Sequence, residues 1–465
     1  MVLYAAFGIV FLTVFPPTLL VADSWLTLVA GREVAEHGLP SVDELTVLGL
    51  GQTWTDQQWG AQLIAYGSHA LGGYGLLAVV VALFAIGAFV IAAIAARKLG
   101  AGPRSILLTF FPVLMAAPWT FTIRAQVFAL PLFTALIWLL ASEARNPSRR
   151  VYLVFPLGVV WGNIHGSAAL AAMLTMLLGA IELMSTRGRS GLRSIALLVL
   201  SPLALLVTPY GPVDTARYYH LLLIDPPFGR ELVTEWRRSE PAWDTLVFYV
   251  LAALTLLAVV KGRRRLTLFD MAALALTFAG AVLAIRGIPW FGLTCLILVP
   301  VALGPMLEGR TARVPRAFDR GLSYAAVAVL ALVAVLALAR HDSWYLKNWP
   351  EGAVSDVRHS LTPKTRVFAT SRDADWILWR VPELRGRLAY DVRFEIYDRK
   401  TFERIVRFRG EQGKDWKSLA DGYEVLVFET EQEPSPHASD FLAGRGARAI
   451  YRDDRVTVVL RPATP

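Results

Sequence analysis

The sequence predicts a polytopic α-helical membrane protein with a C-terminal extracytoplasmic α/β domain. Hydrophobic residues make up 55% of the 465-residue chain, and the mean hydropathy of +0.48 lies well above that of soluble domains. Long apolar runs are concentrated in residues 1–340, whereas residues 341–465 mix apolar and charged positions as a water-soluble domain does. Basic residues also recur in every second predicted loop, which is typical of a chain that crosses a bilayer many times.

The first three quarters of the chain contain apolar runs long enough for membrane-spanning helices, which need about 20 residues each. Two of these runs, at 105–121 and 151–164, are shorter than that. We predict eleven spans, at 2–22, 74–96, 105–121, 125–142, 151–164, 167–184, 194–210, 244–260, 267–285, 288–307 and 321–340. The first has no basic residues before it and no small-residue cleavage site, so we interpret it as a retained span.

The loops between these runs predict how the chain is oriented. Lys and Arg gather in alternate short loops, and cytoplasmic loops retain such residues. The N-terminus is therefore predicted to be cytoplasmic, and an odd number of spans places the C-terminal domain outside. The basic loops contain Arg97, Lys98 and Arg104; Arg145, Arg149 and Arg150; Arg187, Arg189 and Arg193; Lys261 and Arg263–Arg265; and Arg310, Arg313, Arg316 and Arg320.

Two outer loops are long, at 23–73 and 209–243, and we assign both to the transmembrane domain 1–340. The segment from Ser24 to His37 places Trp25, Leu28 and Val29 on one helical face, which predicts a helix lying in the membrane interface. A second helix is expected over 56–71, and aromatic residues in 209–243 predict that this loop also lies along the membrane surface.

The last part of the chain, 341–465, reads as a separate soluble α/β domain after a polar connector at 341–363. Its expected strands cover 365–370, 387–391, 423–428, 447–452 and 455–461, and its expected helices cover 372–380, 398–409, 415–421 and 436–444. Neither a G-x-G-x-x-G pattern nor a phosphate-binding loop opens any of these helices, so the domain is not assigned a nucleotide.

Charge and cysteine content exclude other classes of protein. The net charge of +9 comes largely from the short loops, which argues for cytoplasmic retention of basic residues and against nucleic acid as a partner. The single cysteine, Cys295, lies within an apolar run and provides neither a disulfide framework nor a thiolate metal site.

The most informative pattern is the side on which polar residues gather. Ionisable groups at membrane depth are costly and usually functional. Here they come from separate hairpins and are all predicted at the outer ends of spans or in outer loops. These candidate site residues are Asp23, Arg124, Asn163, His165, Tyr210, Glu235 and Arg286, with Trp236 beside Glu235.

Each candidate also has a structural interpretation. Asp23 could cap the following helix, and Arg124 and Arg286 could anchor lipid headgroups. Asn163 and His165 could satisfy backbone groups near Gly162 and Gly166, Glu235 could be a plain surface carboxylate, and a metal-ligand role for His165 is disfavoured because no second His or Cys stands at ligand spacing. A surface or structural role is expected for Asp373, Asp391 and Arg393.

At these residues the chain resembles the GT-C class of membrane glycosyltransferases, especially bacterial mannosyl- and arabinosyltransferase-like members. Short matching pieces follow one another in order along most of the chain. They are D-S-W-L-T-L-V-A-G-R at 23–32, H-G-L-P-S-V-D-E at 37–44, W-T-D-Q-Q-W at 54–59, F-T-I-R-A-Q-V-F at 121–128, W-G-N-I-H-G at 161–166, T-P-Y-G at 208–211, E-W at 235–236, R-G-I-P-W-F at 286–291 and R-L-A-Y-D-V-R-F-E-I-Y at 387–397.

The resemblance implies a polyprenyl-phosphate sugar donor and a catalytic Asp in the first outer loop, where Asp23 stands. Asp23 would take the proton of the acceptor hydroxyl, and the arginines would bind the departing phosphate. Many relatives have a second acid at the place of Val21 and a His at that of Thr27, so these departures weigh against a divalent metal and against activity. Binding of substrate or lipid phosphate is expected from Arg124, Arg286, His165, Asn163, Tyr210, Glu235 and Asp43.

Two other functions fit the same residues. A transporter or flippase for a lipid-linked sugar would use the phosphate-binding arginines without a base, but should show related halves and charges near the membrane midplane. A catalytically inactive relative could act as an assembly partner. For the enzyme, the partners would be the lipid-linked donor, the bilayer, and a glycan or protein acceptor; its place would be the plasma membrane.

Overall fold

The computed structural model describes residues 19–117, 121–185, 191–224, 236–307, 316–430, 438–444 and 446–462. The chain divides into two compact units, which we describe separately. The first comprises residues 75–219 and 233–339, together with the N-terminal 1–16. The second comprises 17–74, 220–232 and 340–465.

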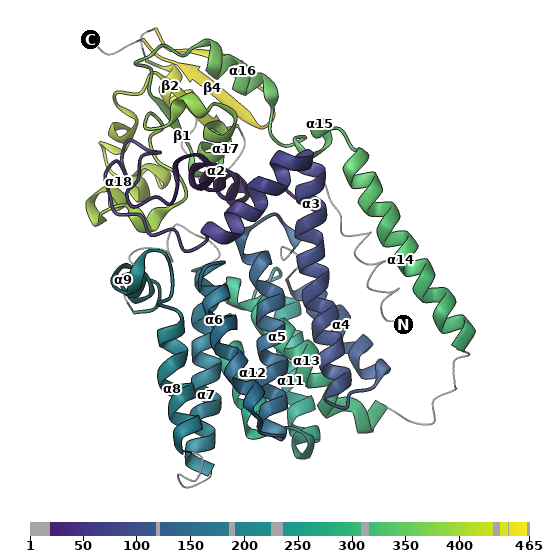
Figure 1. Ribbon diagram of the computed structural model, residues 1–465. Helices are drawn as coiled ribbons and strands as arrows, with labels where there is room; N and C mark the ends of the chain where they lie inside the picture. Colours follow the sequence, from purple (N-terminus) through teal and green to yellow (C-terminus); the bar gives the residue numbers. More distant parts are fainter. Residues whose placement is uncertain are drawn as a thin grey trace. The chain divides into compact units, whose positions relative to one another are not determined.

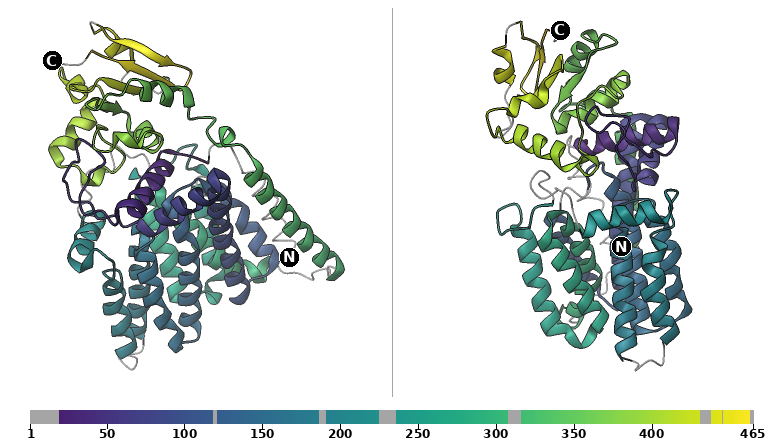
Figure 2. Two further views of the ribbon diagram at one scale, coloured as in Figure 1. Left: turned by 45° about the horizontal axis from the view of Figure 1, so that its top comes forward. Right: turned by 90° about the vertical axis from the view of Figure 1, so that its left-hand side faces the viewer.

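Most helices of the first unit form a bundle in which they run side by side, and α14 (Arg316–Ala339) stands apart from it (Figures 1 and 2). Helix α13 is its centre: it packs against α4, α5, α11 and α12, and its apolar residues are almost entirely buried. The first helix of this unit is the part of α3 (Trp59–Lys98) from residue 75 onward. The others are α4 (Pro103–Ala116), α5 (Ala125–Arg145), α6 (Val154–Gly162), α7 (Ala169–Ser185), α8 (Gly191–Ala204), α9 (Gly211–Leu223), α11 (Leu246–Gly262), α12 (Leu268–Leu283), α13 (Ile288–Leu307) and α14 (Arg316–Ala339).

Within the described residues, five helices are long and apolar enough to cross a membrane: Trp59–Lys98, Ala125–Arg145, Gly166–Ser185, Leu246–Arg265 and Ile285–Gly304. Each predicted span from 74–96 onward coincides with a helix, although the helices expected at 105–121 and 194–210 end early, at Ala116 and Ala204. The first predicted span, 2–22, lies almost wholly outside the described residues, and the count of eleven stays a prediction.

Ion pairs join helix ends within the first unit. Arg145 at the end of α5 binds both carboxylate oxygens of Asp270, at 3.1 and 2.7 Å, and Asp270 also accepts from the Thr267 amide in a capping box at the start of α12. Arg193 on α8 binds Glu182 on α7 and Glu143 on α5. These three acids therefore serve helix packing.

The second unit contains a four-stranded sheet in the order β1-β2-β4-β3. Strand β1 (Val367–Ala369) is parallel to β2 (Val425–Glu429), whereas β4 (Val456–Leu460) is antiparallel to both β2 and β3 (Arg448–Arg452). All residues of β1 and β2 are buried, as expected for strands covered on both faces. The helical elements are α2 (Ala22–His37), α15 (Asp342–Tyr345), α16 (Glu351–His359), α17 (Ser371–Arg380), η7 (Pro382–Leu384), η8 (Phe394–Ile396), α18 (Arg399–Arg409), η9 (Trp416–Ala420) and α19 (Ala438–Leu442).

Two predictions for the C-terminal region were wrong. The segment 341–363 is not a polar connector: it contains α15 and α16, α16 packs against β3 and β4, and Trp349 is buried. The segment 387–391 is not a strand, because Leu388 forms only single bridges, to Thr46 and to Val367.

The first outer loop differs most from expectation. Residues 17–74 belong to the same compact unit as the C-terminal residues, whereas the sequence predicted 23–73 to be part of the transmembrane domain. The apolar face of α2 is not free to lie in lipid, because Trp25, Leu28 and Val29 are fully buried and α2 packs along α17. A sequence pattern marks a face as apolar but does not say whether protein or lipid covers it.

Candidate functional site

Asp23 lies in the first turn of α2, half-buried. The helix begins at Ala22, and the Val21 amide donates to Ser24 Oγ at 2.9 Å, so Ser24 makes the reciprocal hydrogen bond that closes the N-terminus. Asp23 is therefore inside the helix and not before it, as a capping residue would be.

Aromatic and cationic contacts hold α2 in place from several parts of the second unit. Trp25 packs edge-on against Trp349, with ring centroids 5.1 Å apart, and against Tyr74 at 6.0 Å. Arg32 donates to the carbonyl oxygens of Trp379 (3.1 Å) and Leu378 (3.0 Å) at the end of α17, and its guanidinium lies 4.9 Å from the Trp379 ring centre. Residues far away in the sequence thus fix the position of the helix that carries Asp23.

Asp43 is part of a fully buried charged network. One of its oxygens accepts from Arg393 Nη2 at 2.7 Å, and the other from the Thr46 hydroxyl at 2.5 Å. Arg393 also donates to Asp391 through Nε (2.8 Å) and Nη2 (2.5 Å), and its guanidinium lies 4.1 Å from the centre of the Trp54 ring. This network ties the first outer loop to the segment after η7, so its geometry indicates a structural role for Asp43.

Asp375 on α17 connects this network electrostatically with Asp23. The Asp375 side chain is fully buried. Its burial, followed by the nearby charge of Asp391, raises the pKa of its carboxyl well above the usual value, and Asp23 adds to the same effect while Arg393 opposes it. The sequence gives one sign of Asp375, which is an acid among apolar residues in an amphipathic helix.

In the first unit, two arginine-bearing loops are joined by a hydrogen bond. Arg124 is the residue that precedes α5, and Arg286 lies in the short turn η6 (Ile285–Gly287) between α12 and α13. Gln126, two residues after Arg124, donates to the Arg286 carbonyl at 3.5 Å. The Arg286 guanidinium lies 4.5 Å from the Trp236 ring centre, a stacking that orients the cation.

His165 lies close to the same arginine, in the turn between α6 and η3 (Gly166–Ala168). The Ser167 amide donates to His165 Nδ1 at 3.0 Å, and since an amide can only donate, the neutral ring carries its proton on Nε2. Burial, and secondarily the Arg286 charge, lower the pKa of the imidazole, so it is neutral near pH 7. A side chain on Gly166 would collide with the Tyr218 hydroxyl, so Tyr218 would have to shift to make room for it.

Asn163 and Tyr210 border the same turn. Asn163 Nδ2 donates to the carbonyl oxygens of Val159 and Val207, both at 2.9 Å, and so joins the end of α6 to the segment after α8. Tyr210 is half-buried three residues beyond Val207. Within the first unit, Arg286 thus lies near His165, and Asn163 borders the same turn. Arg124 stands two residues before the Gln126 side chain that reaches the Arg286 carbonyl. Asp23 and Asp43 belong to the second unit, and Glu235 lies outside the described residues.

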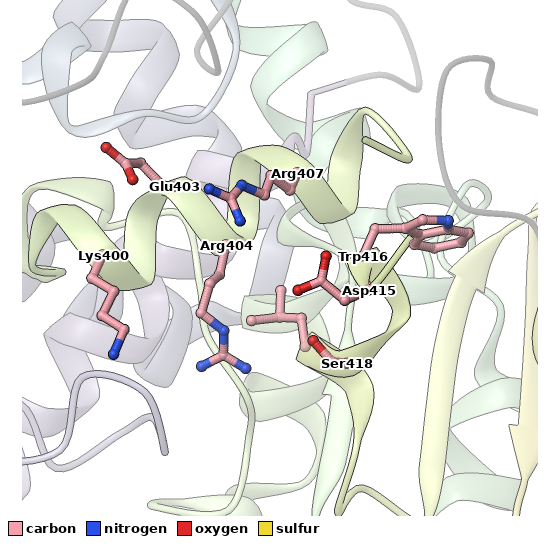
Figure 3. A pocket seen from close by; sticks show the side chains of 8 residues that line it. Lys400, Glu403, Arg404, Arg407, Asp415, Trp416 and Ser418 are labelled. Carbon is pink, nitrogen blue, oxygen red and sulfur yellow. The ribbon is translucent and has the colours of Figure 1, made fainter. Parts of the chain in front are cut away.

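Two other possible sites are less informative. Within the described residues, no group of three or more His, Cys, Asp or Glu side chains is arranged to hold a metal ion. A groove of about 270 Å³ on α18 and η9 of the second unit (Figure 3) contains none of the predicted site residues. It is lined by Lys400, Glu403, Arg404, Arg407, Asp415, Trp416, Ser418 and Leu419, so its acids offset much of its positive charge.

Comparison with solved structures identifies the fold. The chain is similar over its full length to ArnT from Cupriavidus metallidurans bound to undecaprenyl phosphate, with a TM-score of 0.55, 16% identity, and coverage of 100% of this chain and 99% of that one. It is also similar to the oligosaccharyltransferase AglB from Archaeoglobus fulgidus, in complex with an inhibitory peptide and a dolichol-phosphate. The TM-score is 0.50 and the identity 12%, and the match covers 92% of this chain and 69% of that one. A third likeness is to the mycobacterial arabinofuranosyltransferase AftD, with a TM-score of 0.52 and 15% identity. The match covers 99% of this chain, which spans only 41% of AftD.

These likenesses define a class of fold. No family model matches the sequence, and no curated protein matches it in sequence. The chain has the fold of GT-C membrane glycosyltransferases, as its sequence resemblance implied, with apolar helices that suit a membrane and a small sheet-containing unit toward its C-terminus.

Proposed function

We propose that this protein is a membrane glycosyltransferase that moves a sugar from a polyprenyl-phosphate donor to an extracytoplasmic acceptor. The observation that carries the proposal is the full-length likeness to ArnT, which was crystallised with undecaprenyl phosphate. The closeness of Arg286 to His165 supports it, because a guanidinium group and an imidazole N–H are donors that suit a phosphate. Arg124 stands two residues before Gln126, whose side chain reaches the Arg286 carbonyl, and would add a second guanidinium.

In this mechanism the arginines bind the phosphate that leaves. Guanidinium groups present paired donors to phosphate oxygens, and they stabilise the charge that develops as the bond from the anomeric carbon to the phosphate oxygen breaks. Trp236 holds the Arg286 guanidinium by stacking. His165 would donate from Nε2, and Tyr210 and Glu235 would contact the sugar or phosphate. Asn163 would keep the turn before His165 in position through its two backbone hydrogen bonds.

Asp23 would be the general base. The acceptor hydroxyl oxygen attacks the anomeric carbon while Asp23 takes its proton, and polyprenyl phosphate departs from the opposite side. This single displacement inverts the anomeric configuration. Asp43, through its hydrogen bond to Arg393, would act indirectly by fixing the loop between α2 and α3.

The proposal requires one orientation of the chain. The N-terminus would be cytoplasmic, the chain would cross the plasma membrane several times, and the second unit would be extracytoplasmic, where a glycan or protein acceptor is found. This orientation rests on the alternation of basic loops along the sequence.

The test is a transfer assay on the purified full-length chain in lipid nanodiscs, with radiolabelled polyprenyl-phosphate sugars and mixed acceptors. We expect release of free polyprenyl phosphate, reduced about 10²–10⁴-fold by Asp23→Asn. Arg286→Lys should also reduce it, because a lysine cannot offer the paired donors of a guanidinium. Glu36→Gln, at an exposed position on the same helix, is the matched control and should keep wild-type activity.

The outcome separates the rival functions. Movement of the labelled donor across the bilayer without cleavage would identify a flippase. Neither movement nor cleavage would favour the inactive relative, which the departures at Val21 and Thr27 suggest. Cleavage that Asp23→Asn leaves unchanged would remove Asp23 from the role of base.

A further inference from the structure

The segment before α3 buries several polar side chains that the proposed mechanism does not use. Asp56, Gln57 and Gln62 are only 4%, 3% and 3% exposed. They belong to the piece W-T-D-Q-Q-W and to the first turn of the helix that follows. Long polar side chains seldom occupy such positions without hydrogen-bond partners, so what each polar atom contacts is informative.

Part of this hydrogen-bonding capacity is used within the segment, and part is not. Asp56 Oδ1 accepts from the Gln58 amide at 3.1 Å and from Gln62 Nε2 at 2.9 Å. Among the described residues, Asp56 Oδ2, Gln62 Oε1 and both amide atoms of Gln57 have no hydrogen-bond partner. A buried polar atom left unpaired destabilises the fold, so four of them in one short segment call for a functional explanation.

Arg393 adds a fifth atom to this group. Its Nη1 is buried and has no hydrogen-bond partner among the described residues, while Nε and Nη2 hold Asp391 and Asp43. The guanidinium packs over Trp54, two residues before Asp56, and its charge acts on the Asp56 carboxyl. We call Trp54, Asp56, Gln57, Gln62 and Arg393 the polar cluster.

The kinds of unpaired atom in the polar cluster indicate the ligand. Two are acceptors, on Gln57 and Gln62, and two are donors, Gln57 Nε2 and Arg393 Nη1. The fifth, Asp56 Oδ2, accepts when the carboxyl is ionised and donates when it is protonated. The phosphate of a lipid-linked donor offers only acceptors at neutral pH and would leave the oxygens of Gln57 and Gln62 unmatched. Sugar hydroxyls both donate and accept, so neighbouring ring hydroxyls can match such a mixed set.

The polar cluster also lies in the electrostatic surroundings of the candidate base. Asp375 is influenced by both Arg393 and Asp23, so it connects the two within the second unit. In addition, a side chain on Gly31 of α2 would collide with the Gln62 carbonyl, which shows how closely the start of α3 packs on the helix that carries Asp23.

We propose that the polar cluster binds the ring hydroxyls of a sugar, with Gln57 as its central ligand because both of its amide atoms are unpaired. That this binding serves sugar transfer rests on the proposed function. The bound sugar can be that of the lipid-linked donor or that of the acceptor glycan. Gln57, Gln62 and Arg393 are binding residues in this proposal and take no part in proton transfer.

The test measures sugar binding directly on the full-length chain in nanodiscs. Saturation-transfer NMR is recorded with a panel of methyl glycosides of the common hexoses and pentoses, with methyl inositol ethers as polyols of different shape. We expect at least one glycoside to bind, and Gln57→Met to weaken that binding about tenfold through the loss of two hydrogen bonds. Gln52→Met, at an exposed position in the same loop, should bind like wild type.

A stability measurement distinguishes binding from a purely structural role. If Gln57 is unpaired in the free protein, Gln57→Met should leave Tm unchanged or raise it, because an apolar side chain of similar size removes two unsatisfied polar atoms. A fall in Tm, or the absence of any glycoside whose binding depends on Gln57, would overturn the proposal.

The transfer assay then identifies the source of the sugar. A raised KM for the lipid-linked donor in Gln57→Met assigns the cluster to the donor sugar, and a raised KM for the acceptor assigns it to the acceptor glycan. An active enzyme with neither KM raised contradicts the proposal. Glycoside binding by a chain without transfer activity would instead uphold the sugar site while the proposed function fails.

Discussion

The buried Arg393 makes the sharpest stability prediction. Its side chain is 2% exposed, and its partners Asp43 and Asp391 are fully buried. Arg393→Met keeps the length of the side chain but leaves two buried carboxylates without their cation. Breaking a buried ion pair in this way costs about 3–5 kcal/mol in unfolding free energy. At roughly 2–4 °C per kcal/mol for a domain of 150–250 residues, we expect the second unit to lose about 6–20 °C in Tm.

The assay is thermal unfolding of the full-length protein, followed by tryptophan fluorescence and by protease sensitivity of residues 340–465. Arg399→Met is the matched control, because Arg399 is 81% exposed and its pair with Glu403 should contribute at most about 1 kcal/mol. The triple variant Asp43→Asn, Asp391→Asn, Arg393→Met removes the stranded charges and should recover part of the loss. If Arg393→Met has the same Tm as Arg399→Met, the network of Asp43, Asp391 and Arg393 does not join the first outer loop to the rest of its unit.

Two further predictions concern pH and topology. Burial raises the pKa of the Asp56 carboxyl from 3.8 to about 7, so between these pH values the folded protein keeps a proton that the unfolded chain releases. The contribution of this carboxyl to the free energy of unfolding is fully present below about pH 3.8 and is lost as the pH rises through about 7. Tm should therefore fall more from pH 5 to pH 8 in wild type than in Asp56→Asn, and equal slopes would contradict a buried, protonated Asp56. For topology, the natural Cys295 is buried and should not react with a maleimide, so labelling reports on introduced cysteines. A membrane-impermeant maleimide added to intact cells should label Gln52→Cys from outside and spare Asn146→Cys. The reverse pattern would invert the proposed orientation.

The sequence was sufficient for the membrane helices. Their apolar length is a local property, and the helix positions from α3 to α14 follow the hydropathy pattern closely. It was also sufficient for the fold class, because short pieces around Asp23, Arg124, His165 and Arg286 resemble GT-C proteins in their order, and the chain has that fold. Asp23 and the basic loops could be found without coordinates, since each stands beside a span that is visible in the sequence.

Other features depended on contacts between distant residues. Asp43 was predicted as a substrate ligand and Arg393 as a surface or structural residue, yet the two form one buried pair across 350 positions of sequence. The same holds for Trp25 and Trp349, whose contact covers a helix face that the sequence assigned to lipid. Hydropathy and helical periodicity report what a residue avoids, which is water. Only tertiary structure decides which partner replaces that water, and here this decided how the helix carrying Asp23 is held.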